Sequence, residues 1–305
     1  MKRRYVTADV FTDQIFGGNP LAVVLDSAGL STAQMQAIAL EFNYSETTFV
    51  LPPEDPAHTA KIRIFTPRTE VPFAGHPNVG TAFVLAREPH FAAAAAGGKF
   101  VFEETAGLVP LELLRVHDAI VGAELSAPEA LSRRSAVSRE AAAACLSLDP
   151  SDIAIEAHAP QIASVGLPFL IVEVRSRDAL RRSTPNIAAH AELLPLDGAD
   201  AIFAYWRAAE ESPGSGEAVL HARTFSPLDG IVEDPATGSA CAAAIALLAT
   251  LAADPRPELA WRIHQGVDMG RPSLLLGRTS SRHSKVIATH IGGRCVAVLE
   301  GTLVL

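Results

Sequence analysis

Cysteine is scarce in this sequence, which has three in 305 residues: Cys145, Cys241 and Cys295. They are odd in number and widely spaced, and no Cys-x-x-Cys pair occurs among them. This pattern suggests neither a disulfide framework nor a zinc site. We therefore expect a reduced compartment and a cytoplasmic location.

Positive charge and long apolar runs are limited as well. Lys and Arg total 25 against 34 Asp and Glu, giving a net charge of -9, and no dense basic cluster follows Lys2-Arg3-Arg4. A nucleic-acid partner is therefore not expected. The residues after MKRRY alternate and supply no apolar signal-peptide region. The longest small-apolar run, residues 240–253, is shorter than the roughly 20 residues that cross a bilayer. We interpret it as a buried helix and expect no membrane partner.

Motifs for nucleotides, metals and serine hydrolases are missing. The sequence contains no G-x-x-x-x-G-K-[ST], G-x-G-x-x-G or H-E-x-x-H, so we expect no cofactor and no metal. Ser239 together with His76 and Asp234 would suit a hydrolase. However, no G-x-S-x-G is present and Asp234 lies only five residues before Ser239, so this alternative has little support.

Three motifs of the first half recur in the second half in the same order. GNPLAVV (18–24) is echoed by GLPFLIV (166–172), IFTP (64–67) by TFSP (224–227), and HPNVGTA (76–82) by DPATGSA (234–240). The spacing between the copies is about 150 to 160 residues each time, which indicates two copies of one fold. We expect an N-terminal copy at residues 1–117, to which the C-terminal strand could return, and a C-terminal copy at residues 118–305. The join lies between about residues 117 and 137, a polar stretch without periodicity.

Local patterns place the elements of the first copy. Residues 5–11 alternate as a strand does, and a turn and a second strand follow. Ser31 begins a helix with Gln34 in a capping-box position, and Asn43 closes it. SETTFVLPP then resumes as a strand, so Glu46 stands at a helix-to-strand junction. The segments 92–98 and 212–217 are interpreted as a loop or frayed helix and as a hairpin tip, respectively.

Each copy contains one helix of small apolar residues, VGTAFVLA (79–86) in the first and GSACAAAIALLATLAA (238–253) in the second. A helix that is apolar on all sides must be enclosed, and the short strands of each copy are available to enclose it. We therefore predict an α+β fold of two pseudo-symmetric halves, each a curved sheet or barrel around one central helix.

Polar residues, a proline and a glycine precede both of these helices. Free N–H groups and the positive end of the helix dipole make such a helix start suitable for a carboxylate. Two similar halves could aim both helix starts at one shared cleft. From this local pattern alone, His76 could equally be a helix-capping residue with a structural role, and Asp234 and Ser239 could be capping groups as well.

At these motifs the sequence resembles a known family. GNPLAVV, NYSETTFV, FTPRTEVPFAGHPNVG, EDPATGSA and QGVDMGRPS (265–273) occur in the order found in the PhzF-like phenazine biosynthesis family, whose fold is similar to that of diaminopimelate epimerase. The resemblance covers nearly the whole chain. It implies a cofactor-independent isomerase, a homodimer, with a cleft between two similar domains.

The resemblance also implies site residues. Glu46 matches the family's acid/base carboxylate and His76 its histidine, while Asp234 and Ser239 match its remaining polar pair. Cleft positions that would bind substrate are Asn19, Ser45, Gly75 and Gly238. Related epimerases and racemases use paired cysteines near the two helix starts, where this sequence has Pro77 and Pro235.

The hypothesis is a suprafacial proton shift by Glu46 on a small carboxylate-bearing substrate like trans-2,3-dihydro-3-hydroxyanthranilate. A glutamate in apolar surroundings is suited to take up a proton and return it elsewhere, because burial disfavours its charged form. Alternatives are an amino-acid epimerase or racemase and a small-molecule binding protein on the same scaffold.

Overall fold

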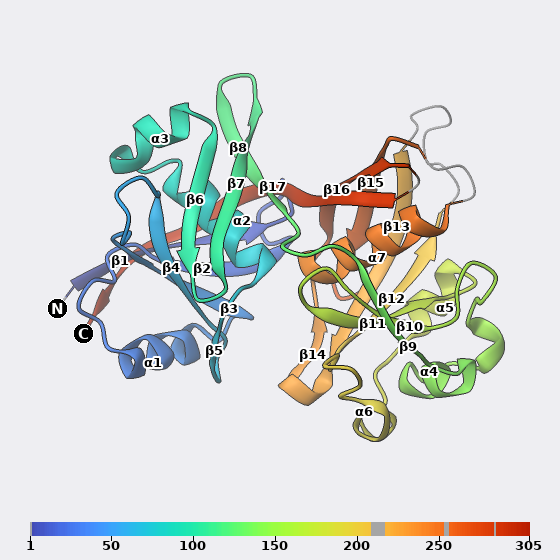
Figure 1. Cartoon of the computed structure of the whole chain (residues 1–305). Coiled ribbons are helices and arrows are strands. Elements are labelled where there is room, and N and C mark those ends of the chain that lie inside the picture. Colours follow the sequence, from blue (N-terminus) through green and yellow to red (C-terminus); the bar gives the residue numbers. More distant parts are fainter. Residues whose placement is uncertain (1, 209–216, 253–255, 284) are drawn as a thin grey trace. The chain divides into compact units, whose positions relative to one another are not determined.

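The computed structural model describes residues 2–208, 217–252, 256–283 and 285–305. They form two compact units, unit 1 (residues 1–126 and 292–305) and unit 2 (residues 127–291) (Figure 1). The division at Ser126 falls nine residues after the predicted boundary at 117, and residues 292–305 belong to unit 1. The hairpin segment predicted at 212–217 lies largely outside the described residues.

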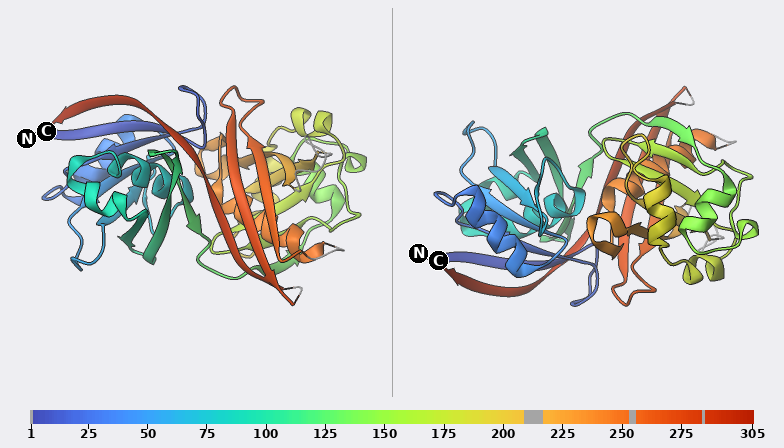
Figure 2. Two further views of the ribbon diagram at one scale, coloured as in Figure 1. Left: turned by 90° about the horizontal axis from the view of Figure 1, so that it is seen from above. Right: turned by 90° about the horizontal axis from the view of Figure 1, so that it is seen from below.

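The reason for this division is strand pairing within unit 1. The strand Ala119–Ser126 pairs along its length with the strand Gly107–Val116, so it belongs to the first sheet. The last strand of the chain, Lys285–Val304, pairs from Cys295 to Val304 with the first strand, Lys2–Val10. The two run side by side with both chain ends together (Figure 2).

Unit 1 contains β1 (Lys2–Val10), β2 (Asn19–Val24), α1 (Thr32–Phe42), β3 (Glu46–Leu51), β4 (Ala60–Phe65), β5 (Glu70–Val71), α2 (Gly75–Leu85), a 3₁₀ turn (Pro89–Phe91), α3 (Ala92–Ala96), β6 (Lys99–Glu104), β7 (Gly107–Val116) and β8 (Ala119–Ser126). Unit 2 contains β9 (Ser132–Ala136), α4 (Arg139–Cys145), a 3₁₀ turn (Pro150–Asp152), β10 (Gln161–Ser164), β11 (Pro168–Glu173), α5 (Arg177–Arg182), α6 (Ile187–Leu193), β12 (Ile202–Arg207), β13 (Glu217–Ser226), a 3₁₀ turn (Pro227–Asp229), β14 (Ile231–Asp234), α7 (Gly238–Leu251), β15 (Glu258–Gln265) and β16 (Ser273–Arg282). The last strand, β17 (Lys285–Val304), begins in unit 2 and ends in unit 1.

The two units repeat one strand topology. In unit 1, β2 is antiparallel to β1 and parallel to β3, β4 is antiparallel to β3 and β5, and β6 is parallel to β4. In unit 2, β11 is antiparallel to β10 and parallel to β12, β13 is antiparallel to β12 and β14, and β15 is parallel to β13. The predicted α+β fold of two similar halves is confirmed, and its central helices are α2 and α7.

The central helices form the cores of their own units. Every residue of α2 is buried, and the helix packs on β1, β2, β3, β7 and β8. Gly80 allows this close packing, because a Cβ at that position would stand 2.6 Å from the Leu21 and Val10 side chains. Helix α7 is buried over most of its length and packs on β10, β11, β15 and β16.

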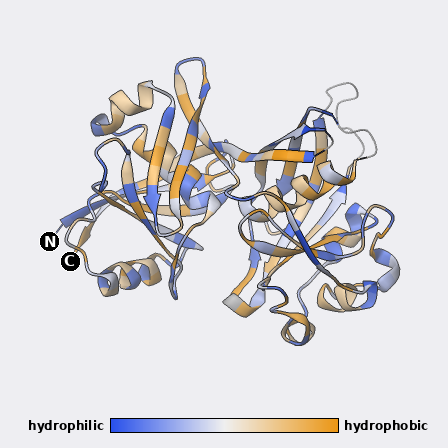
Figure 3. Cartoon of the chain, in the orientation of Figure 1, coloured by the Kyte–Doolittle hydropathy of each residue, from blue (hydrophilic) through white to orange (hydrophobic). Residues whose placement is uncertain are grey.

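Local sequence signals account for the elements around these cores. Helix α1 starts at the predicted capping box, with the Gln34 N–H donating to Ser31 Oγ at 3.2 Å, and ends at Asn43 in the left-handed region. The surrounding strands β6 and β7 carry both hydrophobic and hydrophilic residues (Figure 3), and buried positions alternate with more exposed ones along most of each strand. None of the helices among the described residues has the length and apolar character needed to span a membrane.

Candidate functional site

The predicted site residues of unit 1 come together at the first turn of α2. Asn19 begins β2, Ser45 and Glu46 lie where β3 starts, and Gly75 and His76 begin α2. Strands β2 and β3 are parallel neighbours, with Leu21 opposite Glu46. Their starts therefore lie at the same edge of the sheet, next to the start of the helix that packs against them.

His76 is the centre of this group. Its Nε2 lies 3.4 Å from Glu46 Oε2, and its Nδ1 lies 3.4 Å from Asn19 Nδ2. Ser45 Oγ donates to Asn19 Oδ1 at 3.5 Å, which orients the Asn19 amide with its NH₂ toward His76. An NH₂ group can only donate, so Nδ1 accepts and the imidazole proton is on Nε2, the nitrogen that faces Glu46.

Burial determines the charge of this histidine. The His76 side chain is 6% exposed and that of Glu46 is 17% exposed. Burial lowers the pKa of His76 to about 3, because a buried imidazolium loses its hydration. At neutral pH, His76 is therefore a neutral hydrogen-bond donor beside a carboxylate that solvent still reaches.

The start of α2 leaves backbone donors available. Ala74 precedes the helix in an extended conformation, and no side chain of the described residues caps the first turn. The unbonded N–H groups of such a turn attract a carboxylate or another anion. This turn, with Gly75 at its first position, can hold an anionic group next to Glu46 and His76.

In unit 2, the predicted residues lie around the start of α7. Asp234 ends β14, Gly238 is the first residue of α7, and Ser239 is half-buried in its first turn. Thr237 Oγ1 donates to Asp234 Oδ2 at 2.5 Å. This hydrogen bond holds the Asp234 side chain against Thr237, the residue that precedes α7.

The sequence analysis missed Gln265, which organises this loop. Its side chain is fully buried at the end of β15. Gln265 Nε2 donates to the Asp234 carbonyl at 2.9 Å, to Thr237 Oγ1 at 3.0 Å and to Thr224 Oγ1 at 3.1 Å, while Oε1 accepts the Thr237 N–H at 3.1 Å. Its position at the start of the motif QGVDMGRPS was the signal in the sequence that Gln265 matters. The motif does not indicate which loop the glutamine binds.

The glycine after Gln265 completes the contact with the same loop. Gly266 has φ +72°, and a Cβ there would stand 2.3 Å from the Arg271 carbonyl oxygen and 2.6 Å from that of Pro235. Ser273 Oγ also donates to the Pro235 carbonyl at 2.9 Å. The QGVDMGRPS segment therefore supports the backbone of DPATGSA.

The cysteines do not form an acid/base pair. All three are buried, and Cys241 lies inside α7 with its thiol donating to Gln265 Oε1 at 3.6 Å. Burial raises the pKa of the Cys241 thiol above its ordinary value. Within the described residues, no three His, Cys, Asp or Glu side chains gather as metal ligands would.

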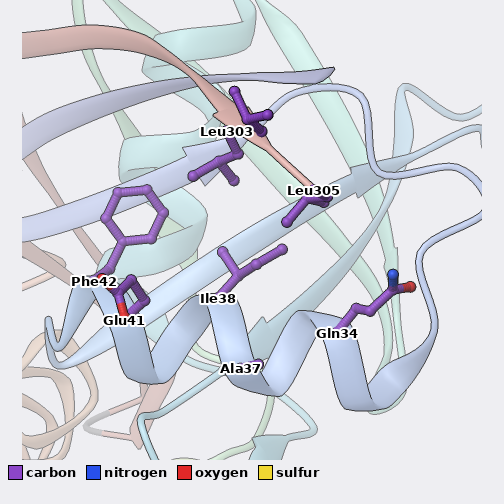
Figure 4. A pocket seen from close by; sticks show the side chains of 8 residues that line it. Gln34, Ala37, Ile38, Glu41, Phe42, Leu303 and Leu305 are labelled. Carbon is purple, nitrogen blue, oxygen red and sulfur yellow. The ribbon is translucent and has the colours of Figure 1, made fainter. Parts of the chain in front are cut away.

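A separate apolar cavity of about 300 Å³ lies between α1 and the C-terminal residues of unit 1 (Figure 4). Its lining comprises Gln34, Ala37, Ile38, Glu41, Phe42, Leu303, Val304 and Leu305. None of the predicted site residues belongs to this lining, so the cavity is distinct from the candidate site.

Comparison with known proteins agrees with this architecture. The phenazine biosynthesis-like protein family matches residues 8–301. An uncharacterized isomerase of Mesorhizobium japonicum is 41% identical over 305 residues, covering 99% of this chain and 98% of that protein. The trans-2,3-dihydro-3-hydroxyanthranilate isomerase of Pseudomonas chlororaphis is 35% identical over 306 residues, covering 99% of each.

A solved structure shows the same fold. The crystal structure of the Bacillus anthracis phenazine biosynthesis protein of the PhzF family superimposes with a TM-score of 0.84 at 24% identity and covers 100% of both chains. The fold is thus the one found in proteins of the PhzF family. The prediction of an isomerase is confirmed by the relatives, which are named isomerases. The chain belongs to the phenazine biosynthesis-like protein family.

Proposed function

We propose that this protein shifts a proton on a small carboxylate-bearing substrate of the trans-2,3-dihydro-3-hydroxyanthranilate type, without a cofactor, and that Glu46 is its acid/base. The observation that carries the proposal is the Glu46 carboxylate 3.4 Å from a neutral, buried His76 at the uncapped start of α2. The 35% identity to a trans-2,3-dihydro-3-hydroxyanthranilate isomerase supports the substrate class.

In this proposal, Glu46 removes a proton from one carbon of the substrate and returns it to another on the same face. The electron pair left on the first carbon moves through the adjoining double bond, so the product is an isomer and Glu46 regains its starting state. The first-turn N–H groups of α2 hold the substrate carboxylate. The Nε2–H of His76 donates to a polar substituent of the substrate or to Glu46.

We extend the proposal to unit 2. Asp234 and Ser239 are proposed as further polar groups acting on the same substrate, and Asn19, Ser45, Gly75 and Gly238 as substrate-binding positions. Asn19 would act through His76, whose ring it orients. Gly75 and Gly238 would act through backbone N–H groups, since each is the first residue of its helix.

Proton exchange with solvent tests the proposal. The protein is incubated with trans-2,3-dihydro-3-hydroxyanthranilate in deuterated water, and the product is analysed by NMR for deuterium at carbon. Turnover should fall by about 10² to 10⁴ in Glu46→Gln, the usual effect of removing a general acid/base. Glu41→Gln, a change of an exposed glutamate on α1, serves as the matched control. Full turnover in Glu46→Gln contradicts the mechanism, as does product without deuterium where the Glu46 proton exchanges with solvent before it is returned.

The racemase alternative receives less support because it would need a cysteine base. Cys241 is enclosed in α7 and burial raises the pKa of its thiol. A binding protein on the same scaffold would show a ligand-induced rise in Tm but no deuterium in the recovered ligand. The homodimer stays a prediction, and light scattering of the purified chain tests it.

A further inference from the structure

Glu104 is a carboxyl group near the candidate site that the proposed mechanism does not use. It is the last residue of β6, and the chain after it returns beside the segment that leads into α2, where the Ala106 N–H donates to the Pro72 carbonyl at 3.2 Å. The side chain beside its carboxyl group belongs to Asn78, in the first turns of α2. Asn78 is two residues after His76.

The hydrogen bonds around Asn78 fix the direction of its amide. Asn78 is fully buried, and its Nδ2 donates to the Ala74 carbonyl at 3.0 Å. The opposite orientation would place two acceptor oxygens against each other, so Oδ1 must point away from Ala74. The amide NH₂ is therefore used to hold the residue that precedes the helix.

This leaves a local shortage of donors. Asn78 Oδ1 and both carboxyl oxygens of Glu104 are buried, and within the described residues none of the three meets a donor at hydrogen-bonding distance and angle. The second N–H of the Asn78 amide faces Glu104 closely enough to lower its pKa, but it can serve only one of these three acceptors. An ionised carboxylate offers only acceptors, and so does an amide oxygen. Buried acceptors without a donor destabilise a fold, because they lose their hydrogen bonds to water. A proton on Glu104 is the group that would supply the missing donor.

Charged and titratable groups on the surrounding elements have other partners. The pairs are Lys61 with Glu54, Arg63 with Glu70, Glu103 with His58, Lys99 with Glu112, Arg115 with the carbonyls of Ala95 and Asp118, and His76 with Glu46. The pairing of β4 with β6 runs to Lys61 opposite Glu103, and the next residue of β4, Ile62, is apolar and buried. Burial raises the pKa of Glu104 to about 8, and the Asn78 amide, which lowers this pKa, offsets only part of the effect.

We propose that Glu104 is a positioning residue, held as a neutral carboxylic acid that donates its proton to Asn78 Oδ1 and so fixes the first turn of α2. Asn78 in turn holds the Ala74 carbonyl, and His76 lies between these two residues in the sequence. The proton of Glu104 therefore fixes the backbone that carries His76. The consequence for catalysis rests on the proposed function, whereas the protonation and its effect on His76 do not.

Three variants test whether Glu104 acts as a hydrogen-bond donor or only fills space. Glu104→Gln keeps the size and supplies an NH₂ donor at every pH, so it should retain the first turn of α2. Glu104→Ala removes the donor. Glu103→Gln is the matched control, because Glu103 is the neighbouring residue on β6 and its pKa is lowered to about 2 by the Glu54 and Asp55 N–H groups and His58.

The first measurement follows protonation directly. In protein labelled with ¹³C at the glutamate carboxyl carbon, one resonance should titrate near pH 8, be absent in Glu104→Gln and persist in Glu103→Gln. The ¹⁵N resonances of the His76 ring should shift through the same pH range in the wild type and stay constant in Glu104→Gln. Titration of the Glu104 resonance near its ordinary pKa of 4.5 would show that Glu104 is ionised at neutral pH and would overturn the proposal. This result is expected if a bridging water, rather than the Glu104 proton, supplies the donor.

The second measurement is the pH profile of deuterium exchange into trans-2,3-dihydro-3-hydroxyanthranilate. Between pH 7 and pH 9, wild-type turnover should fall about tenfold, as expected for a required proton with a pKa about 8. Glu104→Gln should rescue this alkaline loss, Glu104→Ala should be impaired at every pH, and Glu103→Gln should follow the wild type. The positioning role is overturned if Glu104→Gln loses as much turnover between pH 7 and pH 9 as the wild type. It is also overturned if the His76 ring resonances do not shift near pH 8. If the wild type shows no turnover at any pH, the proposed function is contradicted. The NMR titrations then still test whether Glu104 is protonated and whether its proton affects His76.

Discussion

Acid should weaken unit 1 through His76. The pKa of this residue is lowered by burial from 6.5 to about 3. Between these two values the unfolded chain binds a proton that the folded chain does not, so stability is complete above pH 6.5 and is lost as the pH falls toward 3. Each pH unit in this window costs about 1.4 kcal/mol. At pH 4.5 the loss is therefore about 3 kcal/mol, a large part of an ordinary domain's stability.

The comparison variant is His76→Gln, which keeps a polar side chain but does not titrate. Other groups that destabilise the fold in acid do so in both proteins, so the difference between their pH slopes isolates His76. His90→Gln, a change of an exposed histidine in the same unit, controls for the loss of a histidine as such. It should follow the wild type.

The assay must report unit 1. Both tryptophans, Trp206 and Trp261, lie in unit 2, so tryptophan fluorescence would report the unfolding of unit 2 and not of unit 1. Hydrogen exchange of the α2 amides, corrected for intrinsic rates, gives the free energy of opening where His76 lies. From pH 7.5 to 4.5 this free energy should fall about 3 kcal/mol more in the wild type than in His76→Gln. Equal slopes would refute the reasoning and show that Glu46, 3.4 Å away, stabilises the imidazolium as much as burial destabilises it.

Three further outcomes are expected. Glu46→Gln should lower turnover by about 10² to 10⁴ while leaving the Tm of the chain within a few degrees, because the side chain is at the solvent-accessible start of β3. Gln265→Leu should destabilise unit 2 by about 3 kcal/mol, since it leaves the buried Thr237 N–H and its neighbours without partners, and urea unfolding followed by Trp261 fluorescence measures this. Gln36→Leu, which removes one hydrogen bond to the Thr66 carbonyl in unit 1, should leave that transition unchanged. Cys241→Ala should keep its turnover in the deuterium-exchange assay, and a loss of 10²-fold or more would restore the cysteine-based alternative.

Much of the fold could be predicted because its signals are local or repeated. The capping box of Ser31 and Gln34 is complete within four residues, so the start of α1 does not depend on tertiary contacts. The small apolar residues of α2 and α7 require burial wherever the chain goes. The end of the first segment of unit 1, at Ser126, lies within the join expected at residues 117–137. Its exact position depends on β8 and the end of β17, which join unit 1 through pairing with other strands.

The same distinction applies to the site. The resemblance of SETTF and GHPNVG to the family's motifs implied that Glu46 and His76 belong to one site, and the structure brings them within 3.4 Å. Gln265 was missed because its partners, Thr224, Asp234 and Thr237, are 28 to 41 residues away in the sequence. A buried glutamine and an exposed one look the same in a sequence without its contacts.

The sequence by itself determined the two copies of the fold, their central helices and the position of Glu46 at a strand start, because these depend on the apolar pattern and on turn residues. Only the tertiary structure decided the charge of His76, the direction of the Asn78 amide and the shortage of donors around Glu104. Each of these depends on burial and on which atoms face one another, and neither is encoded in any short stretch of residues.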